Sequence, residues 1–167
     1  MGTKLSHLDS NDQPQMVNIA EKAVTERSAE ARAVVCFPPD AAVLLGLDQA
    51  PSLSTPELRV PKGPVFQTAI IAGIMAAKKT HELIPLCHPL SLDQVTVDIQ
   101  ALGKGIVEIR STCRTTHRTG VEMEALTAAS IAALTIYDMC KAISHQIEIR
   151  ELMLVTKSGG RSDYERS

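Results

Sequence analysis

The feature that most constrains the fold is an uncharged apolar segment in the last third of the chain, from Ala125 to Tyr137. Alanine recurs there among larger aliphatic residues, so a helix over 120–144 would be apolar on nearly all sides. A helix that covers one face of a small sheet needs only an apolar stripe. This helix therefore requires a second packing partner, and in a chain of 167 residues we expect another subunit to supply it. The sequence predicts a homo-oligomer.

Two charged residues follow this apolar segment, Asp138 and Lys141. They are three positions apart, so their side chains lie on one face of the helix within reach of each other. Burying a charge costs on the order of several kcal/mol per ion unless a partner compensates for the lost water. A buried lysine also shifts its pKa readily, which suits general acid–base catalysis. The pair is therefore either a structural salt bridge or part of a reaction centre, and these residues alone leave both interpretations open.

The remaining segments alternate between helix and strand patterns. Period-two alternation predicts strands over four segments, 31–37, 95–101, 105–115 and 146–157. The middle two form a hairpin around the turn LGKG. Helices are predicted over 40–47, with Asp40 as the N-cap, and over 64–79, where Pro64 suits the first helical turn. This order predicts an α+β sandwich, in which a mainly antiparallel sheet carries helices packed on one face.

Length and composition indicate a soluble globular protein with a single domain over 1–167. Residues 48–61 are rich in proline and indicate a loop, and we expect the polar ends, 1–15 and 158–167, to be flexible. The N-terminal region has no apolar run, so we expect neither a secretory signal nor a membrane span. The cysteines form no C-x-x-C pair, which favours reduced thiols and a cytoplasmic location.

Charge and aromatic content argue against a nucleic-acid-binding protein. The formal net charge is −2, and aromatic residues make up 2% of the chain. Single-stranded nucleic acid is commonly bound on aromatic stacking platforms, and a polyanion or membrane surface attracts an excess of positive charge. We therefore expect no nucleic-acid partner and no membrane partner. Any anion site must be a local cluster of basic residues.

Two motifs carry residues that could contact a ligand. Glu122 and Glu124 open the apolar helix, where acidic residues often only complement the helix dipole. His88 lies between Cys87 and Pro89 in IPLCHPL, a stiff loop that could present its imidazole to a ligand. A hydrogen-bonded structural histidine is equally compatible with this pattern. Zinc binding is disfavoured, because an adjacent Cys and His cannot easily face one tetrahedral ion.

Basic residues at helix ends could form anion sites. Lys62 stands beside Gly63 directly before a predicted helix, whose first backbone N–H groups attract anions. The spaced glycine and the Lys-Ser/Thr pair of a P-loop are missing there. Lys78, at the other end of that helix, could simply be solvated. The segment KSGGR at 157–161 is either a phosphate-binding segment or a frayed end.

Several of these segments together resemble one family. KGPVFQTA, AGIMAAKKTHELIPLCHPL, TGVEMEALTAAS, AALTIYDMCKA and KSGG occur in this order between about Leu5 and Gly160. They are similar to the motifs of the cyclic pyranopterin monophosphate synthase family of molybdenum cofactor biosynthesis (MoaC). The resemblance implies a ferredoxin-like subunit in a homo-hexamer, a trimer of dimers. It also implies a lyase that converts a cyclised dihydro-GTP to cyclic pyranopterin monophosphate with release of pyrophosphate. No redox cofactor is implied, and whether Mg²⁺ accompanies the triphosphate stays open.

The resemblance also assigns roles to residues. The family's catalytic aspartate and two lysines match Asp138, Lys62 and Lys141. The positions that would contact the substrate are Leu86, Cys87, His88, Glu122, Met123 and Glu124, with Lys78 and Arg27 near the triphosphate. No residue is implied as a metal ligand.

Three positions depart from the family's usual residues. Asn18 and Pro64 stand where aspartate is usual, and Ile70 stands where arginine is often found. The loop 48–61 is also longer than usual. These departures affect loop placement and phosphate contacts, and they leave the three catalytic positions intact.

Two alternatives from other functional classes remain. A relative without catalytic activity could bind a nucleotide or pterin for regulation, and it would bind the substrate without releasing pyrophosphate. A structural oligomer would use Asp138 and Lys141 only as a salt bridge, so that Lys141→Ala would lower the melting temperature substantially. The presence of all three catalytic positions favours the enzyme.

Overall fold

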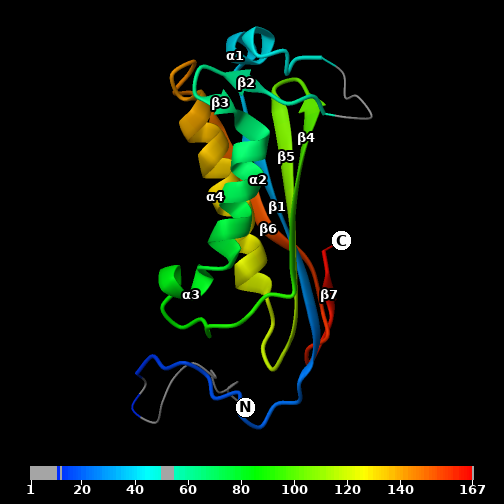
Figure 1. Cartoon of the computed structure of the whole chain (residues 1–167). Coiled ribbons are helices and arrows are strands. Elements are labelled where there is room, and N and C mark those ends of the chain that lie inside the picture. Colours follow the sequence, from blue (N-terminus) through cyan, green and yellow to red (C-terminus); the bar gives the residue numbers. More distant parts are fainter. Residues whose placement is uncertain (1–10, 12, 50–54, 167) are drawn as a thin grey trace.

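An antiparallel sheet forms one layer of the molecule (Figure 1). The computed structural model describes residues 11, 13–49 and 55–166. The strands of the sheet, in spatial order, are β4 (Gln94–Gly103), β5 (Ile106–His117), β1 (Thr25–Cys36), β6 (Glu148–Ser158) and β7 (Tyr164–Glu165). Every neighbouring pair is antiparallel, which confirms the predicted sheet and its β4–β5 hairpin.

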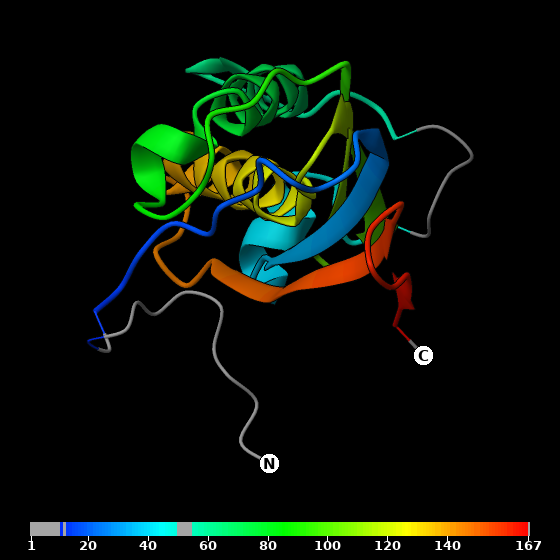
Figure 2. The same ribbon diagram turned by 90° about the horizontal axis from the view of Figure 1, so that it is seen from below.

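Helices cover one face of this sheet. The two long helices, α2 (Val65–Ala77) and α4 (Glu122–Cys140), lie side by side across it (Figures 1 and 2). The short helices α1 (Pro39–Leu44) and α3 (Thr80–Leu83) lie at opposite ends of this layer. The predicted α+β class, with helices on one face of a mainly antiparallel sheet, is confirmed.

The apolar helix α4 finds its second packing partner within the chain. One side of α4 lies on β1, β5 and β6, and another side packs against α2. The alanines of α4 that are 0% exposed are Ala125, Ala128, Ala129, Ala132 and Ala133. Gly73 of α2 comes so close that a Cβ atom there would lie 2.9 Å from the Ala128 carbonyl oxygen. These buried alanines therefore do not by themselves require a second subunit, because α2 packs against them, although Leu134 of α4 is 52% exposed. The oligomer itself stays a prediction.

The structure corrects three local predictions. α1 begins at Pro39 with Pro38 as its N-cap, so Asp40 lies in the first turn and does not cap the helix. Pro64 is the N-cap of α2, one residue before its first turn. The expected loop 48–61 ends in a short strand, β2 (Arg59–Val60), which pairs with β3 (Gly63–Pro64). Residues 50–54 of this loop lie outside the described residues.

The C-terminal segment also differs from expectation. The part expected to be flexible carries β7, in which Tyr164 pairs with Lys157 and Glu165 pairs with Thr156. That part of the segment is therefore a strand of the sheet. Most of 1–15 lies outside the described residues. Among the helices of the described ranges, none combines the length and the apolar character needed to cross a membrane.

Candidate active site

Lys62, Asp138 and Lys141 meet at one end of the helical layer, and we call them the Asp138 cluster. The Lys62 Nζ atom lies 2.9 Å from Asp138 Oδ2, and the Lys141 Nζ atom lies 2.8 Å from Asp138 Oδ1. Lys62 also donates a hydrogen bond of 2.7 Å to the Asp138 carbonyl oxygen. The structure thus brings together the three residues that the family resemblance marks as catalytic.

Local structure explains this convergence. Helix α4 ends at Cys140 with Lys141 as its C-cap, so Asp138 and Lys141 extend from its last turn. Lys62 lies in the turn between β2 and β3, just before α2. Gly63 follows with a φ of 120°, a left-handed value that favours glycine. This tight hairpin directs Lys62 towards Asp138, 76 positions further along the chain.

The two ammonium groups determine the ionisation of Asp138. Hydrogen bonds from Lys141 and from Lys62 lower the pKa of Asp138 to about 2. In return, the hydrogen bond to Asp138 raises the pKa of Lys141. Near neutral pH the Asp138 cluster is therefore one carboxylate between two cations.

The Asp138 cluster is open to solvent. The side chains of Lys62 and Asp138 are 47% and 57% exposed, and that of Lys141 is 48% exposed. Within one chain these charges are not buried, because Asp138 and Lys141 project from the end of α4, beyond its buried alanines. The ion pairs of the single chain are therefore accessible to a ligand or to another subunit, and their burial in an oligomer stays a prediction.

Six of the eight residues predicted to bind the substrate line a pocket at the other end of α4, which we call the Glu124 pocket. Its volume is about 260 Å³. The predicted residues in it are Leu86, Cys87, His88, Glu122, Met123 and Glu124. Further lining residues are Val17, Ile19, Lys22, Leu90, Thr119, Gly120 and Arg161. The stiff loop IPLCHPL and the first turn of α4 therefore both line one concave site.

A hydrogen bond and burial act on polar side chains of the Glu124 pocket. The His88 Nε2 atom lies 2.8 Å from the Val17 carbonyl oxygen, so Nε2 carries a proton and donates it to that oxygen. Glu124 is 4% exposed, and burial, reinforced by the charge of Glu122, raises the pKa of Glu124 to about 7. Glu124 can therefore accept or release a proton near neutral pH. Burial raises the pKa of the Cys87 thiol, which disfavours a nucleophilic thiolate.

A basic pocket of about 480 Å³ adjoins the Glu124 pocket. The two pockets share Lys22, Thr119, Gly120, Glu122 and Arg161. The basic residues that line the basic pocket are Lys22, Arg27, Arg118, Lys157 and Arg161. The one acidic residue among the lining residues, Glu122, lies with its Oε1 atom 3.3 Å from Lys157 Nζ. The excess of positive charge makes this pocket a local anion site in a chain of negative net charge.

The segment 157–161 forms one wall of the basic pocket. Gly159 has a φ of 84°, and a Cβ atom there would lie 1.8 Å from the Glu26 carbonyl oxygen. A Cβ atom on Gly160 would lie 2.9 Å from Arg27 Nη1. The Thr25 hydroxyl donates a hydrogen bond of 2.8 Å to the Gly159 carbonyl oxygen. Because the glycines lack side chains, the segment lies directly against β1 beside Arg27 and is not frayed.

The sequence patterns do not single out Arg118 and Lys22, although both line the basic pocket. Arg118 directly precedes the motif TGVEMEALTAAS, and this position next to a motif could have identified it as a candidate. Lys22 lies next to no motif that would have identified it. Lys78, predicted near the triphosphate, is the C-cap of α2 and lines neither pocket. Its role stays a prediction.

The Asp138 cluster and the Glu124 pocket lie at opposite ends of α4, which has 19 residues. At 1.5 Å per residue, Glu122 and Asp138 are about 24 Å apart along the helix. This separation exceeds the length of a purine nucleotide. One chain therefore does not bring the two sets of residues to one ligand.

No group of three or more His, Cys, Asp or Glu side chains within the described ranges is arranged to hold a metal ion. The four cysteines are free, as predicted; Cys113 and Cys140 are buried, and Cys36 and Cys87 are half-buried. Burial raises the pKa of Cys113 to about 12 and that of Cys140 to about 11. These two thiols are therefore structural.

The sequence pattern that defines the MoaC family matches residues 16–160. The chain belongs to the MoaC family. The matched range contains the Asp138 cluster and every lining residue of the Glu124 pocket except Arg161.

Relatives of this MoaC chain are similar over almost its whole length. A protein of Xanthomonas axonopodis pv. citri (strain 306), named cyclic pyranopterin monophosphate synthase, is 53% identical over 160 residues, which cover 96% of this chain and 92% of that protein. Proteins of the same name from Xanthomonas oryzae pv. oryzae (strain MAFF 311018) and Xanthomonas campestris pv. campestris (strain B100) are 52% and 51% identical over the same shares. The resemblance seen in the sequence is confirmed. The roles of individual residues in this MoaC chain stay predictions.

Proposed function

We propose that this chain is a lyase of molybdenum cofactor biosynthesis and acts as a cyclic pyranopterin monophosphate synthase. In this reaction a cyclised dihydro-GTP is rearranged to cyclic pyranopterin monophosphate, and pyrophosphate leaves. The name that the Xanthomonas relatives share supports this activity. The observation that carries the proposal is the Asp138 cluster, in which two lysine amines converge on one carboxylate.

The Asp138 cluster holds two proton donors beside one carboxylate. Lys62 and Lys141 each donate a hydrogen bond to a different oxygen of Asp138, at 2.9 and 2.8 Å. A ring nitrogen that is released during ring opening can take a proton from either ammonium group. The resulting neutral amine can accept a proton from the hydroxyl that attacks the α-phosphate. Because its pKa is about 2, Asp138 stays ionised throughout and keeps both amines in place. We assign acid–base catalysis to the two lysines and their orientation to Asp138.

We propose that the purine-derived ring binds in the Glu124 pocket. Glu122 and Glu124 offer carboxylate acceptors for the N–H donors of a guanine-type edge. Leu86 and Met123 line the same pocket, and each is 36% exposed, so they offer apolar surface to the faces of a ring. Shape, acceptors and apolar surface together fit a flat heterocycle.

We propose that the triphosphate binds in the basic pocket. Arg27, Arg118 and Arg161 line this pocket from β1, from the segment after β5 and from the segment after β6. A guanidinium group binds phosphate oxygens with two parallel hydrogen bonds, which gives both charge and orientation. The adjacency of the basic pocket and the Glu124 pocket lets one nucleotide extend from the first to the second.

The distance between the two sites supports a reaction centre shared by two subunits. About 24 Å of helix separates the Glu124 pocket from the Asp138 cluster of the same chain. The outer surface of the helical layer carries exposed apolar side chains that could contact another subunit: Ile71 at 60%, Met75 at 56% and Leu134 at 52% exposure. We propose a homo-hexamer, a trimer of dimers, in which the Asp138 cluster of one subunit faces the Glu124 pocket of another.

The order of elements supports a ferredoxin-like subunit. The main elements follow the chain order β1-α2-β4-β5-α4-β6, which is the β-α-β-β-α-β pattern of that fold. Their strands lie in the order β4-β5-β1-β6, so the first strand and the third strand of the pattern are central.

We propose that the reaction needs no redox cofactor, because ring rearrangement, phosphate cyclisation and loss of pyrophosphate leave the overall oxidation state unchanged. Mg²⁺ could accompany the triphosphate. The proposed location is the cytoplasm, with which four free cysteines are compatible. The proposed partners are the nucleotide-derived substrate and further copies of the chain, without nucleic acid or membrane.

Incubation with the cyclised dihydro-GTP tests the proposed function. We expect pyrophosphate release by the unaltered protein and a loss of turnover of about 100-fold or more in Lys62→Ala and in Lys141→Ala. The matched control is Lys79→Ala, which removes another exposed lysine that pairs with an acidic residue, Glu82, at 3.9 Å. The control should keep full turnover, and all three variants should keep the oligomer.

Two outcomes of this experiment would reject the enzyme. Binding of the substrate without pyrophosphate release would favour a regulatory binding protein. A large fall of the melting temperature in Lys141→Ala, without any turnover in the unaltered protein, would favour a purely structural salt bridge. Surface ion pairs as exposed as this one contribute little to stability, so we expect almost no change in melting temperature.

A further inference from the structure

The first turn of α2 is capped by a residue that belongs neither to the helix nor to its N-cap position. Pro64, the N-cap, has no side-chain group that could accept a hydrogen bond from the first turn. The Glu57 carboxylate accepts these bonds instead, from the Phe66 N–H at 2.8 Å and from the Gln67 N–H at 3.1 Å. Phe66 and Gln67 are the second and third residues of α2, whose N–H groups an N-cap side chain ordinarily satisfies. Glu57 therefore replaces the missing cap.

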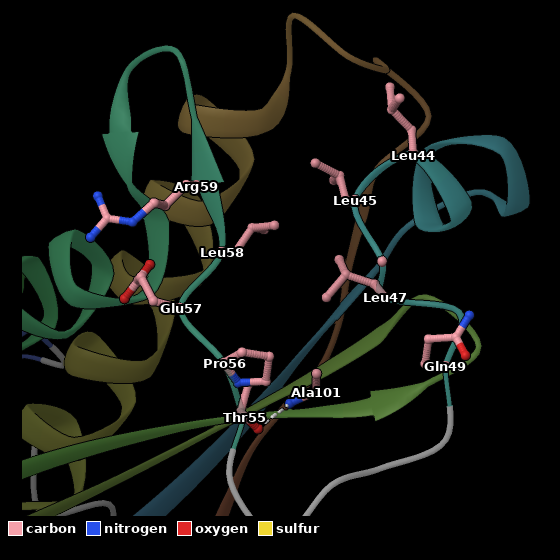
Figure 3. Close-up of a pocket in the computed structure, with 11 residues that line it drawn as sticks. Leu44, Leu45, Leu47, Gln49, Thr55, Pro56, Glu57, Leu58, Arg59 and Ala101 are labelled. Carbon is pink, nitrogen blue, oxygen red and sulfur yellow. Dashed lines mark hydrogen bonds between the residues drawn. The ribbon is translucent and has the colours of Figure 1, made fainter.

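Glu57 belongs to the segment 55–58, which we call the strap. Hydrogen bonds hold this segment at both ends. The Thr55 hydroxyl oxygen accepts a hydrogen bond of 3.0 Å from the Ala101 N–H of β4, drawn as a dashed line in Figure 3. Leu58 is 7% exposed and belongs to the hydrophobic core. Its carbonyl oxygen accepts a hydrogen bond of 2.8 Å from the Val65 N–H, at the start of α2. The strap thus joins β4, the core and α2.

Figure 3 shows Glu57 and Leu58 on opposite sides of the strap. Leu58 points into a pocket of about 370 Å³ that the leucines following α1, Leu45 and Leu47, also line. Glu57 points away from these leucines, and its carboxylate binds the first turn of α2. Because the two side chains point in opposite directions, the Glu57 carboxylate can bind α2 while Leu58 stays in the core.

The strap continues directly into the hairpin that carries Lys62. Arg59 pairs with Pro64 and Val60 pairs with Gly63, so the strap and α2 enter the two open ends of this hairpin. Glu57 connects these two ends, because it belongs to the strap and binds α2. Any opening of the hairpin at its base would move its turn, where Lys62 makes hydrogen bonds of 2.7 and 2.9 Å to Asp138.

We propose that Glu57 is a positioning residue for the Asp138 cluster: it closes the base of the β2–β3 hairpin onto α2 and thereby holds Lys62 against Asp138. Because Pro64 at the N-cap has no capping side chain, Glu57, from the segment before the hairpin, accepts these hydrogen bonds instead. Glu57 does not touch the reacting groups. Its consequence for turnover rests on the proposed function, whereas its effect on the placement of Lys62 can be measured without substrate.

Three variants of the full chain test this role. Glu57→Ala removes the cap. Glu57→Ala combined with Pro64→Asp offers a new carboxylate at the N-cap, the position from which aspartate caps helices best. Glu165→Ala is the control, since it removes an exposed carboxylate on the short strand β7. NMR spectroscopy measures amide hydrogen exchange at Phe66 and Gln67 and the titration of the Asp138 carboxyl group.

In Glu57→Ala we expect exchange at Phe66 and Gln67 to become about 2- to 30-fold faster, as for the loss of a helix cap. The titration of Asp138 should shift to higher pH, because Lys62 leaves while Lys141 stays. The double variant should restore both properties, and the control should change neither. If the unaltered protein turns the substrate over, kcat of Glu57→Ala should fall more than KM rises, and Pro64→Asp should recover it.

Faster exchange with an unchanged Asp138 titration would overturn the proposal, because Glu57 would then only cap α2. Failure of Pro64→Asp to restore the titration would overturn it as well. If Glu57→Ala does not fold, Glu57→Gln, which can accept at one amide oxygen only, should shift the titration in the same direction; no shift would again overturn the proposal. The expected NMR changes in a protein without turnover would reject the proposed function and support the positioning role.

Discussion

Glu124 should make the stability of this protein depend on pH, and Glu124→Gln should remove that dependence. Glu124 is 4% exposed, and burial raises its pKa from 4.5 to about 7. An acid whose pKa is higher in the folded state than in the unfolded state favours folding only while it is protonated. The free energy of unfolding should therefore fall as the pH rises through 4.5 and should level off above about 7.

The size of this effect follows from the two pKa values. The difference between 4.5 and about 7 corresponds to about 3 kcal/mol, at about 1.36 kcal/mol per pKa unit. This is an upper value, because Lys22 and Arg161 line the same pocket and favour the carboxylate, as does any solvent that enters. In a protein of this size 1 kcal/mol shifts the melting temperature by about 2–4 °C, so the effect reaches roughly 6–12 °C.

Thermal unfolding at constant ionic strength, from pH 4.5 to pH 8, measures this effect. The quantity of interest is the melting temperature of Glu124→Gln minus that of the unaltered protein, because other groups titrate in both. It should rise with pH and become constant near pH 8. Glu82→Gln, which neutralises a carboxylate that is 58% exposed, is the control and should show no such rise. A difference that is constant over the whole range would refute the inference that burial raises the pKa of Glu124.

Two further predictions concern the basic pocket and its wall. Arg118→Ala and Arg161→Ala should each weaken the binding of pyrophosphate about tenfold, because a charge-assisted hydrogen bond is removed, and the loss should be smaller at high salt. Calorimetry that finds unchanged affinity in both variants would contradict the assignment of the basic pocket as a phosphate site. Gly159→Ala should lower the free energy of unfolding by about 1–3 kcal/mol in denaturant titrations, because its Cβ atom would lie 1.8 Å from the Glu26 carbonyl oxygen. Gly46→Ala is the control, because Gly46 also has a positive φ, 68°, but no neighbouring atom within 4 Å of its Cβ position. An equal loss of unfolding free energy in both variants would exclude the clash with Glu26 as the cause.

Helix α4 shows what the sequence reveals and what it leaves out. The apolar pattern predicts the helix, and helix geometry then places Asp138 beside Lys141, because residues three apart share a face. The same pattern shows that α4 is buried without showing what buries it. The partner is α2, whose Gly73 allows a close approach that no local pattern predicts. Similarly, the contact between Lys62 and Asp138 depends on tertiary structure, and only the family resemblance links the two residues beforehand.

The cap of α2 could not be predicted for a related reason. Pro64 shows that the helix lacks a capping side chain, but the sequence does not tell which residue replaces it. Glu57 is 9 positions away from Phe66, and its place is fixed by the anchoring of the strap to β4 and to the core. At Lys78 a matching motif suggests a phosphate contact, whereas the structure places this residue at the C-cap of α2, outside both pockets of the same chain, so its role stays a prediction.

The unbroken course of α4 has a consequence for how this protein can vary. Inserting one residue near the exposed Leu134 would advance Asp138 by about 1.5 Å and rotate it by about 100° around the helix axis, away from Lys62. Replacing an exposed side chain there would leave both ends of the helix in register. Natural divergence along α4 should therefore proceed by substitution, while the number of residues between Glu124 and Asp138 stays constant.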